Sequence, residues 1–316
     1  GVTQDLQKAR EHIQPLADEG LARTQSAMGL VYYKQGKIKE SQKWFRKASG
    51  QNYPHAWHMR GVINYRGRKY TKALKWYTKA AENGYPISQN NLALMYYQGR
   101  GVNRDYKKAA YWSLKAAEQG LVQSQYTIGW LYYKGLGISK DRARAEQWYR
   151  RAAEQGFVPA QEKLALIALS DKESGSKEAL DWLKVAAGNG SADAQTNLGI
   201  IYAGGRKVSR DYKKAAEYFR KAAEQGHPLA QNKLGIMYQY GRAVKADNEK
   251  AYLWHRIAAE QGSKDSLLRQ KTIAKNLNPD QREQINKLVQ SHLEIIEQSR
   301  AKNRFAKHRS SLKQNQ

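Results

Sequence analysis

One short sequence, AAEQG or a close variant of it, returns along this chain at a nearly fixed interval. The glycines that end its copies are Gly84, Gly120, Gly156, Gly190, Gly226 and Gly262. The spacing is 36 residues, except for one step of 34 between Gly156 and Gly190. A constant period of this size is typical of a solenoid, in which each repeat buries its apolar face only against its neighbours. We therefore look for function on a long surface rather than in one pocket.

Each repeat carries the signals for two helices. In the unit from Tyr85 to Gly120, PISQNNLALMYYQG places Leu92 and Met95 at helical spacing, which predicts a first helix. A turn with two glycines follows, and Asp105 then stands at the N-cap of a second helix, YKKAAYWSLKAAEQ. Gly120 closes that helix in the position where a left-handed backbone costs least. The pattern predicts paired antiparallel helices, repeated along the chain.

These residues resemble the Sel-1-like repeat family, a relative of the tetratricopeptide repeats. The best local match is ADAQTNLGIIYAGGRKVSRDYKKAAEYFRKAAEQG, residues 192–226, and the resemblance covers about residues 5–262. It implies an all-α fold, a right-handed α-solenoid of helix pairs. Two units match weakly: in residues 53–84, Arg60 and Asn64 replace apolar residues, and residues 157–190 lack the glycine-rich turn.

We expect three segments along the chain. Residues 1–262 form the solenoid, an incomplete first unit followed by seven units, and residues 263–298 form a C-terminal helical cap. Residues 299–316 form a basic tail without an acidic residue. Terminal units of a solenoid must cover the open end of the core. The residues predicted to do so are Leu288, Leu293, Ile295 and Ile296.

Composition limits the classes of function. The net charge of +27 predicts a positive field and acidic partners. Two origins of this charge stay open: solvated helix faces rich in lysine, or a selected basic face built from turn residues. The chain contains no cysteine, which excludes disulfides and thiol chemistry. It also has no apolar run of about 18 residues, so no transmembrane helix is expected.

We predict no catalytic residue, no metal ligand and no cofactor, and therefore no enzyme. His55 and His58 are the only histidines close together, three residues apart on a predicted helix. A two-histidine zinc site with a catalytic glutamate requires the sequence HExxH, and no carboxylate lies between these two histidines. The glycine-rich segments join two helices, whereas a phosphate-binding loop follows a strand.

The predicted binding surface lies on the first helices, which by the resemblance line the concave face. At three equivalent positions of the first four units stand Tyr33, Tyr65, Tyr97 and Tyr133; Leu30, Val62, Leu94 and Trp130; and Ser26, His58, Asn90 and Tyr126. Arg100 and Arg104 would add a basic margin. Two interpretations stay open: each tyrosine packs against the next repeat, or the tyrosines form a recognition groove.

The resulting hypothesis is a non-enzymatic protein that binds an acidic protein partner through its concave face. Members of the family serve as envelope adaptors, host-contact factors and immunity proteins that neutralise secreted effectors. The alternative is a basic surface that binds nucleic acid or anionic lipid, although no nucleic-acid-binding module is present. The start at a repeat turn, the opening PLADEG and the lack of cysteine favour a bacterial periplasmic or secreted protein, with a cytoplasmic one as the alternative. We expect a monomer when the partner is absent.

Overall fold

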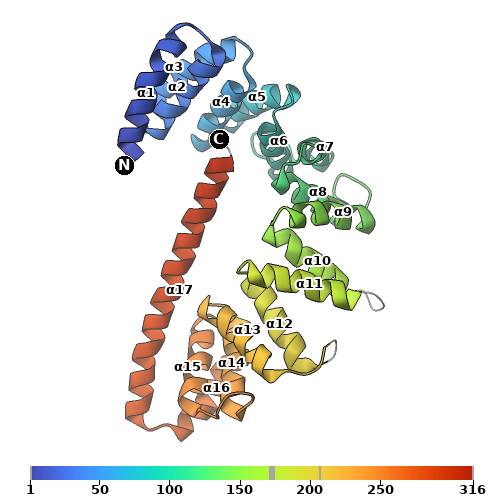
Figure 1. Cartoon of the computed structure of the whole chain (residues 1–316), viewed down its shortest axis with the longest axis vertical. Coiled ribbons are helices and arrows are strands. Elements are labelled where there is room, and N and C mark those ends of the chain that lie inside the picture. Colours follow the sequence, from blue (N-terminus) through green and yellow to red (C-terminus); the bar gives the residue numbers. More distant parts are fainter. Residues whose placement is uncertain (1, 171–174, 206–207, 315–316) are drawn as a thin grey trace. The chain divides into compact units, whose positions relative to one another are not determined.

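The computed structural model describes residues 2–170, 175–205 and 208–314, and every regular element within these ranges is a helix (Figure 1). The α-helices are α1 Val2–Asp18, α2 Ala22–Lys34, α3 Ile38–Gly50, α4 Pro54–Arg66, α5 Tyr70–Glu82, α6 Pro86–Gln98, α7 Tyr106–Glu118, α8 Val122–Lys134, α9 Arg142–Glu154, α10 Val158–Ser170, α11 Gly175–Gly188, α12 Ala192–Gly204, α13 Tyr212–Glu224, α14 Pro228–Tyr240, α15 Asn248–Glu260, α16 Lys264–Ile273 and α17 Pro279–Gln314. A short 3₁₀-helix, Ala274–Asn276, joins α16 to α17.

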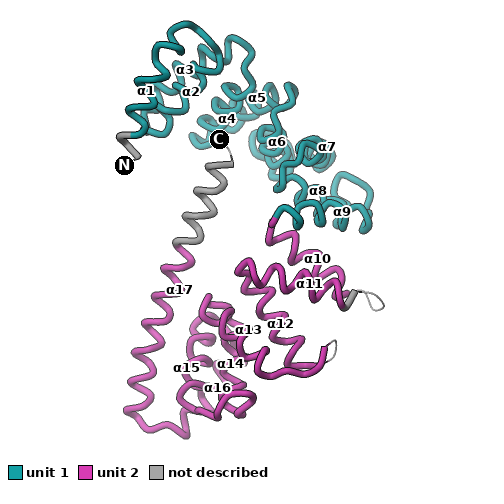
Figure 2. The backbone as a smooth tube through the Cα atoms, viewed as in Figure 1, with its two compact units in different colours: residues 1–155 teal, residues 156–316 magenta. Residues whose placement is uncertain are grey.

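The helices pack in sequential pairs, which confirms the predicted all-α solenoid of the tetratricopeptide type. The chain divides into two compact units (Figure 2). Unit 1 spans residues 1–155 and contains α1 to α9, and unit 2 spans residues 156–316 and contains α10 to α17. Within each repeat the first helix packs against the second, and within each unit the second helix packs against the first helix of the next repeat.

The predicted start and stop signals act as expected. Asp105 accepts a hydrogen bond from the backbone N–H of Lys108 at 2.9 Å. The same N-cap bond recurs at Asp141, Asp211 and Asp247. The turn before α7 needs its second glycine, because Gly101 has φ +72° and a Cβ there would lie 2.6 Å from the backbone of Tyr70.

The core of most repeats forms where a small residue of the first helix faces a large one of the second. A Cβ added at Gly61 would lie 2.5 Å from the ring of Tyr77, and Gly199 faces Phe219 at the same distance. In α5 this large residue, Tyr77, directly follows Trp76. Trp76 itself is only half-buried, because the fully buried position on the helix belongs to the next residue.

Buried glutamines join one repeat to the next, and we call this arrangement the amide clamp. In α6 the Gln89 amide donates to the carbonyl of Ala81 in α5 at 3.1 Å. Its oxygen accepts a hydrogen bond from Gln119 after α7 at 2.8 Å. The same two bonds recur at Gln125, Gln195 and Gln231. Each clamp therefore connects the second helices of two successive repeats.

The C-terminal cap differs in part from the expectation. Ile285, Val289 and Ile296 are buried against the last repeat, whereas Leu288 and Ile295 are about half exposed, so the prediction was wrong for these two side chains. The reason is the phase of the helix: positions spaced by four and seven residues share the buried face. The helix α17 also continues through residue 314 rather than ending before a separate tail.

The first part of α17 is fixed on unit 2. Asn278 and Gln281 cap its start reciprocally, since each side chain bonds to the backbone N–H of the other residue. Further along, Arg300 donates to the carbonyl of Gly226 at 3.0 Å and to Gln261 at 2.6 Å. These bonds connect α17 to the ends of α13 and α15.

Candidate functional site

The candidate binding surface is the first-helix face of unit 1, formed by α2, α4, α6 and α8. Three of its predicted contact residues lie in the interior: Ser26 is 1% exposed, His58 is 0% and Val62 is 8%. Buried side chains cannot contact a partner of the folded chain, so these three residues are not part of the candidate binding surface. The face that remains is narrower than the sequence pattern indicated.

The polar residues one turn before the small residue hold the repeats together. Each bonds to a side chain of the next repeat at 2.7 to 2.8 Å: Ser26 to His55, His58 to Ser88 and Asn90 to Ser124. Tyr126, at the same position of α8, instead packs against Tyr149 with ring centres 5.5 Å apart. This position therefore serves mainly to connect neighbouring repeats. Its side chain differs between repeats, and so does the side chain to which it bonds in the next repeat.

Tyr33, Tyr65 and Tyr97 of the tyrosine stripe are half-buried, and basic residues of the next repeat lie over the first two. The guanidinium of Arg66 lies 5.3 Å from the ring centre of Tyr33. Arg100 lies 5.7 Å from the ring of Tyr65 and donates a hydrogen bond to its hydroxyl. The packing interpretation therefore holds for Tyr33 and Tyr65. The sequence does contain a signal for these contacts, since Arg66 and Arg100 follow Tyr33 and Tyr65 by about one repeat.

The aromatic character increases towards α8. Tyr97 packs edge-to-face against Trp130, with ring centres 5.7 Å apart, and it also contacts Tyr106 at 5.5 Å. Tyr133 at the end of α8 is 39% exposed, and Leu94 in α6 is 36% exposed. Leu30 of α2 remains half-buried, at the far end of the same face. An accessible apolar surface therefore exists on α6 and α8.

The charge on this face comes from arginines. Arg100 and Arg104 are exposed, and Arg104 lies 5.6 Å from the ring centre of Tyr106. Burial raises the pKa of the Tyr33 hydroxyl, and the nearby Arg66 offsets this only in part. Burial likewise lowers the pKa of His55. Both groups are neutral near pH 7, so they add no charge to the surface.

Within the described ranges, no group of three or more histidine, cysteine, aspartate or glutamate side chains is placed to hold a metal ion. His55 and His58 lie with ring centres 6.5 Å apart, and each bonds to a serine of a neighbouring repeat. Among the same described residues, no helix has the length and apolar character that crossing a membrane requires.

Comparison with known proteins identifies the repeats. The Sel1 repeat matches residues 1–21, 23–53, 56–85, 86–121, 122–157, 192–227 and 228–263. The unmatched stretch between residues 157 and 192 is the unit that lacks the glycine-rich turn. No curated protein matches the chain in sequence.

Solved structures extend the comparison. A Sel1 repeat protein from Oxalobacter formigenes is 32% identical with a TM-score of 0.69, over 83% of this chain and 78% of that one. A protective antigen of uropathogenic Escherichia coli strains is 28% identical with a TM-score of 0.55, over 92% of this chain and 72% of that one. The immunity protein Pa5087 from Pseudomonas aeruginosa, at 21% identity and a TM-score of 0.40, covers 66% of this chain and 81% of that one, a likeness too low to bear on function.

Proposed function

This chain belongs to the Sel1 repeat family, and we propose that it is a non-enzymatic protein-binding solenoid whose partner is an acidic protein. The observation that carries the proposal is the aromatic cluster of Tyr97, Trp130 and Tyr133 on neighbouring first helices, with Arg100 and Arg104 exposed nearby. Large aromatic side chains beside arginine are the composition that protein interfaces favour.

The charge of the chain supports an acidic partner. A net charge of +27 produces a long-range positive field, which accelerates encounter with a negatively charged protein. Exposed arginines at the margin contribute mainly to this association rate, whereas the affinity depends on the buried aromatic contacts. The two groups of residues therefore have separable effects on binding kinetics.

The finer proposal is a bacterial envelope protein, periplasmic or secreted, that acts as an adaptor or neutralises an effector. It is motivated by the family resemblance and by the absence of cysteine. Fractionation of the native organism tests the location. Recovery of the protein in the cytoplasmic fraction alone would contradict the envelope role and leave an intracellular adaptor.

The binding proposal is tested by capturing the partner from the native organism and measuring its affinity for Tyr97→Ala and Trp130→Ala. We expect each variant to bind more weakly by about 2 kcal/mol, since both side chains are central and half-buried. Tyr111→Ala is the matched control, because Tyr111 is 53% exposed on a second helix outside this face. Folded Tyr97 and Trp130 variants that bind like the parent would place the partner elsewhere. Arg104→Gln should slow association and leave dissociation nearly unchanged.

A further inference from the structure

The weakly matching repeat α4–α5 departs from the repeats on both sides at two core positions. At the N-cap of its second helix it departs from α6–α7, whereas α3 likewise starts after a lysine, Lys37. Arg60 stands where α6 has Leu92, and the equivalent residues of the other repeats are apolar and buried: Met28, Leu92, Ile128, Leu164, Leu198 and Leu234. Asn64 replaces the tyrosine found at Tyr96, and Lys69 replaces the capping Asp105. All three changes remove apolar or acidic groups and introduce polar or basic ones.

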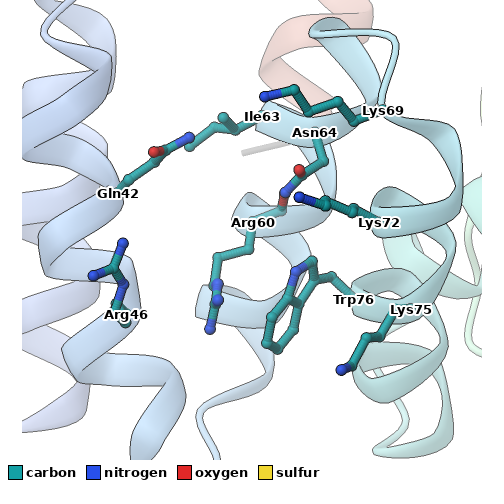
Figure 3. A pocket seen from close by; sticks show the side chains of 9 residues that line it. All are labelled: Gln42, Arg46, Arg60, Ile63, Asn64, Lys69, Lys72, Lys75 and Trp76. Atoms are coloured by element: carbon teal, nitrogen blue, oxygen red, sulfur yellow. The ribbon is translucent and has the colours of Figure 1, made fainter.

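These three residues line one pocket in unit 1 (Figure 3). Its volume is about 400 Å³, and it opens between α3, α4 and α5. Five of the nine lining residues are cationic, and none is a carboxylate. The five are Arg46, Arg60, Lys69, Lys72 and Lys75. Cations from three helices thus surround a space of the size that small ligands occupy.

Contacts within the protein hold Arg60 in place in the pocket wall. Its guanidinium lies 3.5 Å from the ring centre of Trp76, and Figure 3 shows the two side chains next to each other. One of its N–H groups donates to the Ser49 hydroxyl at 2.7 Å, and Asn64 donates to the Arg60 carbonyl at 2.7 Å. Since a guanidinium carries five donors, most of this group's hydrogen-bonding capacity is left for a ligand.

The electrostatics of the pocket also favour the binding of an anion. Burial, and to a lesser extent the neighbouring Arg46, lower the pKa of Arg60. Like charges confined in a partly buried space repel each other, and an anion between them would relieve that repulsion. By contrast, the hollow at the turn of the next repeat, lined by Arg104, Lys107 and Lys108, contains Asp105 as a compensating carboxylate.

We propose that this pocket binds a small ligand that carries two or more phosphate groups. Arg60 and Arg46 offer planar donors that match phosphate oxygens, and the three lysines add point charges around the opening. The ring of Trp76 gives one side of the pocket an apolar surface. The site shares no residue with the proposed protein-binding face, so it constitutes a separate function of unit 1.

Titration calorimetry of the full chain with inorganic tripolyphosphate at low salt tests the site. We expect one binding event per chain, weakened about tenfold or more in Arg60→Met, which restores the apolar residue of the other repeats. Lys72→Gln, an exposed change that leaves the core intact, should weaken binding in the same direction. Lys108→Gln is the matched control, because Lys108 occupies the equivalent position of the next repeat and should bind like the parent.

The same variants distinguish the source of the phosphate. Sedimentation with phosphatidylcholine vesicles, with and without a phosphatidylinositol bisphosphate, tests for a lipid headgroup. Vesicle binding that is lost with Lys72→Gln identifies a membrane phospholipid, whereas binding of tripolyphosphate without binding of these vesicles identifies a soluble ligand. The proposal is overturned if the parent binds neither probe. It is equally overturned if Arg60→Met and Lys72→Gln bind tripolyphosphate no more weakly than Lys108→Gln, which would indicate a diffuse basic surface.

Discussion

Repeats α4–α5 and α6–α7 share a backbone plan but differ in the side chains that occupy it. Each has two helices of 13 residues, a small residue in the first helix and buried alanines in the second. The second repeat of the two fills its core with Leu92 and caps its second helix with Asp105. The first places Arg60 and Lys69 there and forms a cationic pocket.

The contrast shows how few positions the fold requires. Close helix packing depends on the small residue and the alanines, because larger groups would separate the helices. The apolar residue before the small residue and the N-cap add stability without determining the plan. A solenoid that gains stability from many neighbouring interfaces can therefore dedicate one repeat to a ligand site and still fold.

The largest effect is expected in α15, where the residue facing the small position is His255 in place of Tyr77 or Ser113. His255 is fully buried, neither ring nitrogen has a hydrogen-bond partner in the described part of the chain, and burial lowers its pKa to about 4, with Arg269 adding to the shift and Asp265 opposing it. The unfolded imidazole takes up a proton below about pH 6.5, whereas the folded one stays neutral until about pH 4. Stability should therefore fall by about 3 kcal/mol as the pH drops through this window.

His255→Phe checks this expectation, since Phe45 and Phe219 occupy the equivalent position in other repeats. Urea unfolding of parent and variant at pH 7 and pH 4.5 gives the difference. The variant should lose clearly less stability on acidification than the parent. Equal losses in both proteins would assign the acid sensitivity to other groups, such as His55, whose pKa is also lowered by burial.

The next effect concerns the contact of Gly61 with Tyr77. Gly61→Ala should destabilise unit 1 by about 2 kcal/mol, because the new methyl group would lie 2.5 Å from the tyrosine ring. Repeat α6–α7 already combines Ala93 with the smaller Ser113, so Tyr77→Ser should partly rescue Gly61→Ala in the double variant. Thermal unfolding measures both effects. Gly50→Ala is the control, since a methyl group there meets no atom within 4 Å.

The smallest effect is expected at the N-caps of the second helices, where α7 has Asp105 and α5 has Lys69. Asp105→Ala should cost about 1 kcal/mol, because the backbone N–H of Lys108 loses its partner. Lys69→Asp should change stability by less than about 0.5 kcal/mol, since Lys69 has φ −86° and ψ 64°, unlike the −141° and 99° of Asp105. Urea midpoints of the two variants test the pair. A gain from Lys69→Asp as large as the loss from Asp105→Ala would mean that the two starts are equivalent.

The sequence predicted the fold well because its signals are local and repeated. Glycine stops, aspartate caps and helical spacing act within one unit, and several units agree independently. The burial of single residues was harder to predict, since Ser26 and His58 look accessible on one helix and are covered only by the following repeat. In the same way, Leu288 and Ile295 are as apolar as Ile296, and only the packing of α17 on unit 2 distinguishes them.

The candidate site was predictable only in outline. Equivalent positions of the repeats located the aromatic stripe, but the arginines over Tyr33 and Tyr65 come from the next repeat. The pocket around Arg60 had a visible signal, a departure from the repeat pattern, which by itself gives no indication of a cavity. Three departures had to converge in space before a ligand site could be inferred.

The amide clamp makes most repeats of this chain interchangeable. A block such as α6–α7 presents Gln89 towards the preceding block and the carbonyl of Ala117 towards the following one, so duplicates would connect through bonds already present. Duplication of whole blocks in the gene would therefore preserve the hydrogen bonds between repeats. The block α4–α5 is the exception, because Trp57 replaces the glutamine and Arg60 bonds to Ser49 instead. This bond forms only when the preceding block has a serine at the position of Ser49 in α3, so the place of α4–α5 in the array is fixed.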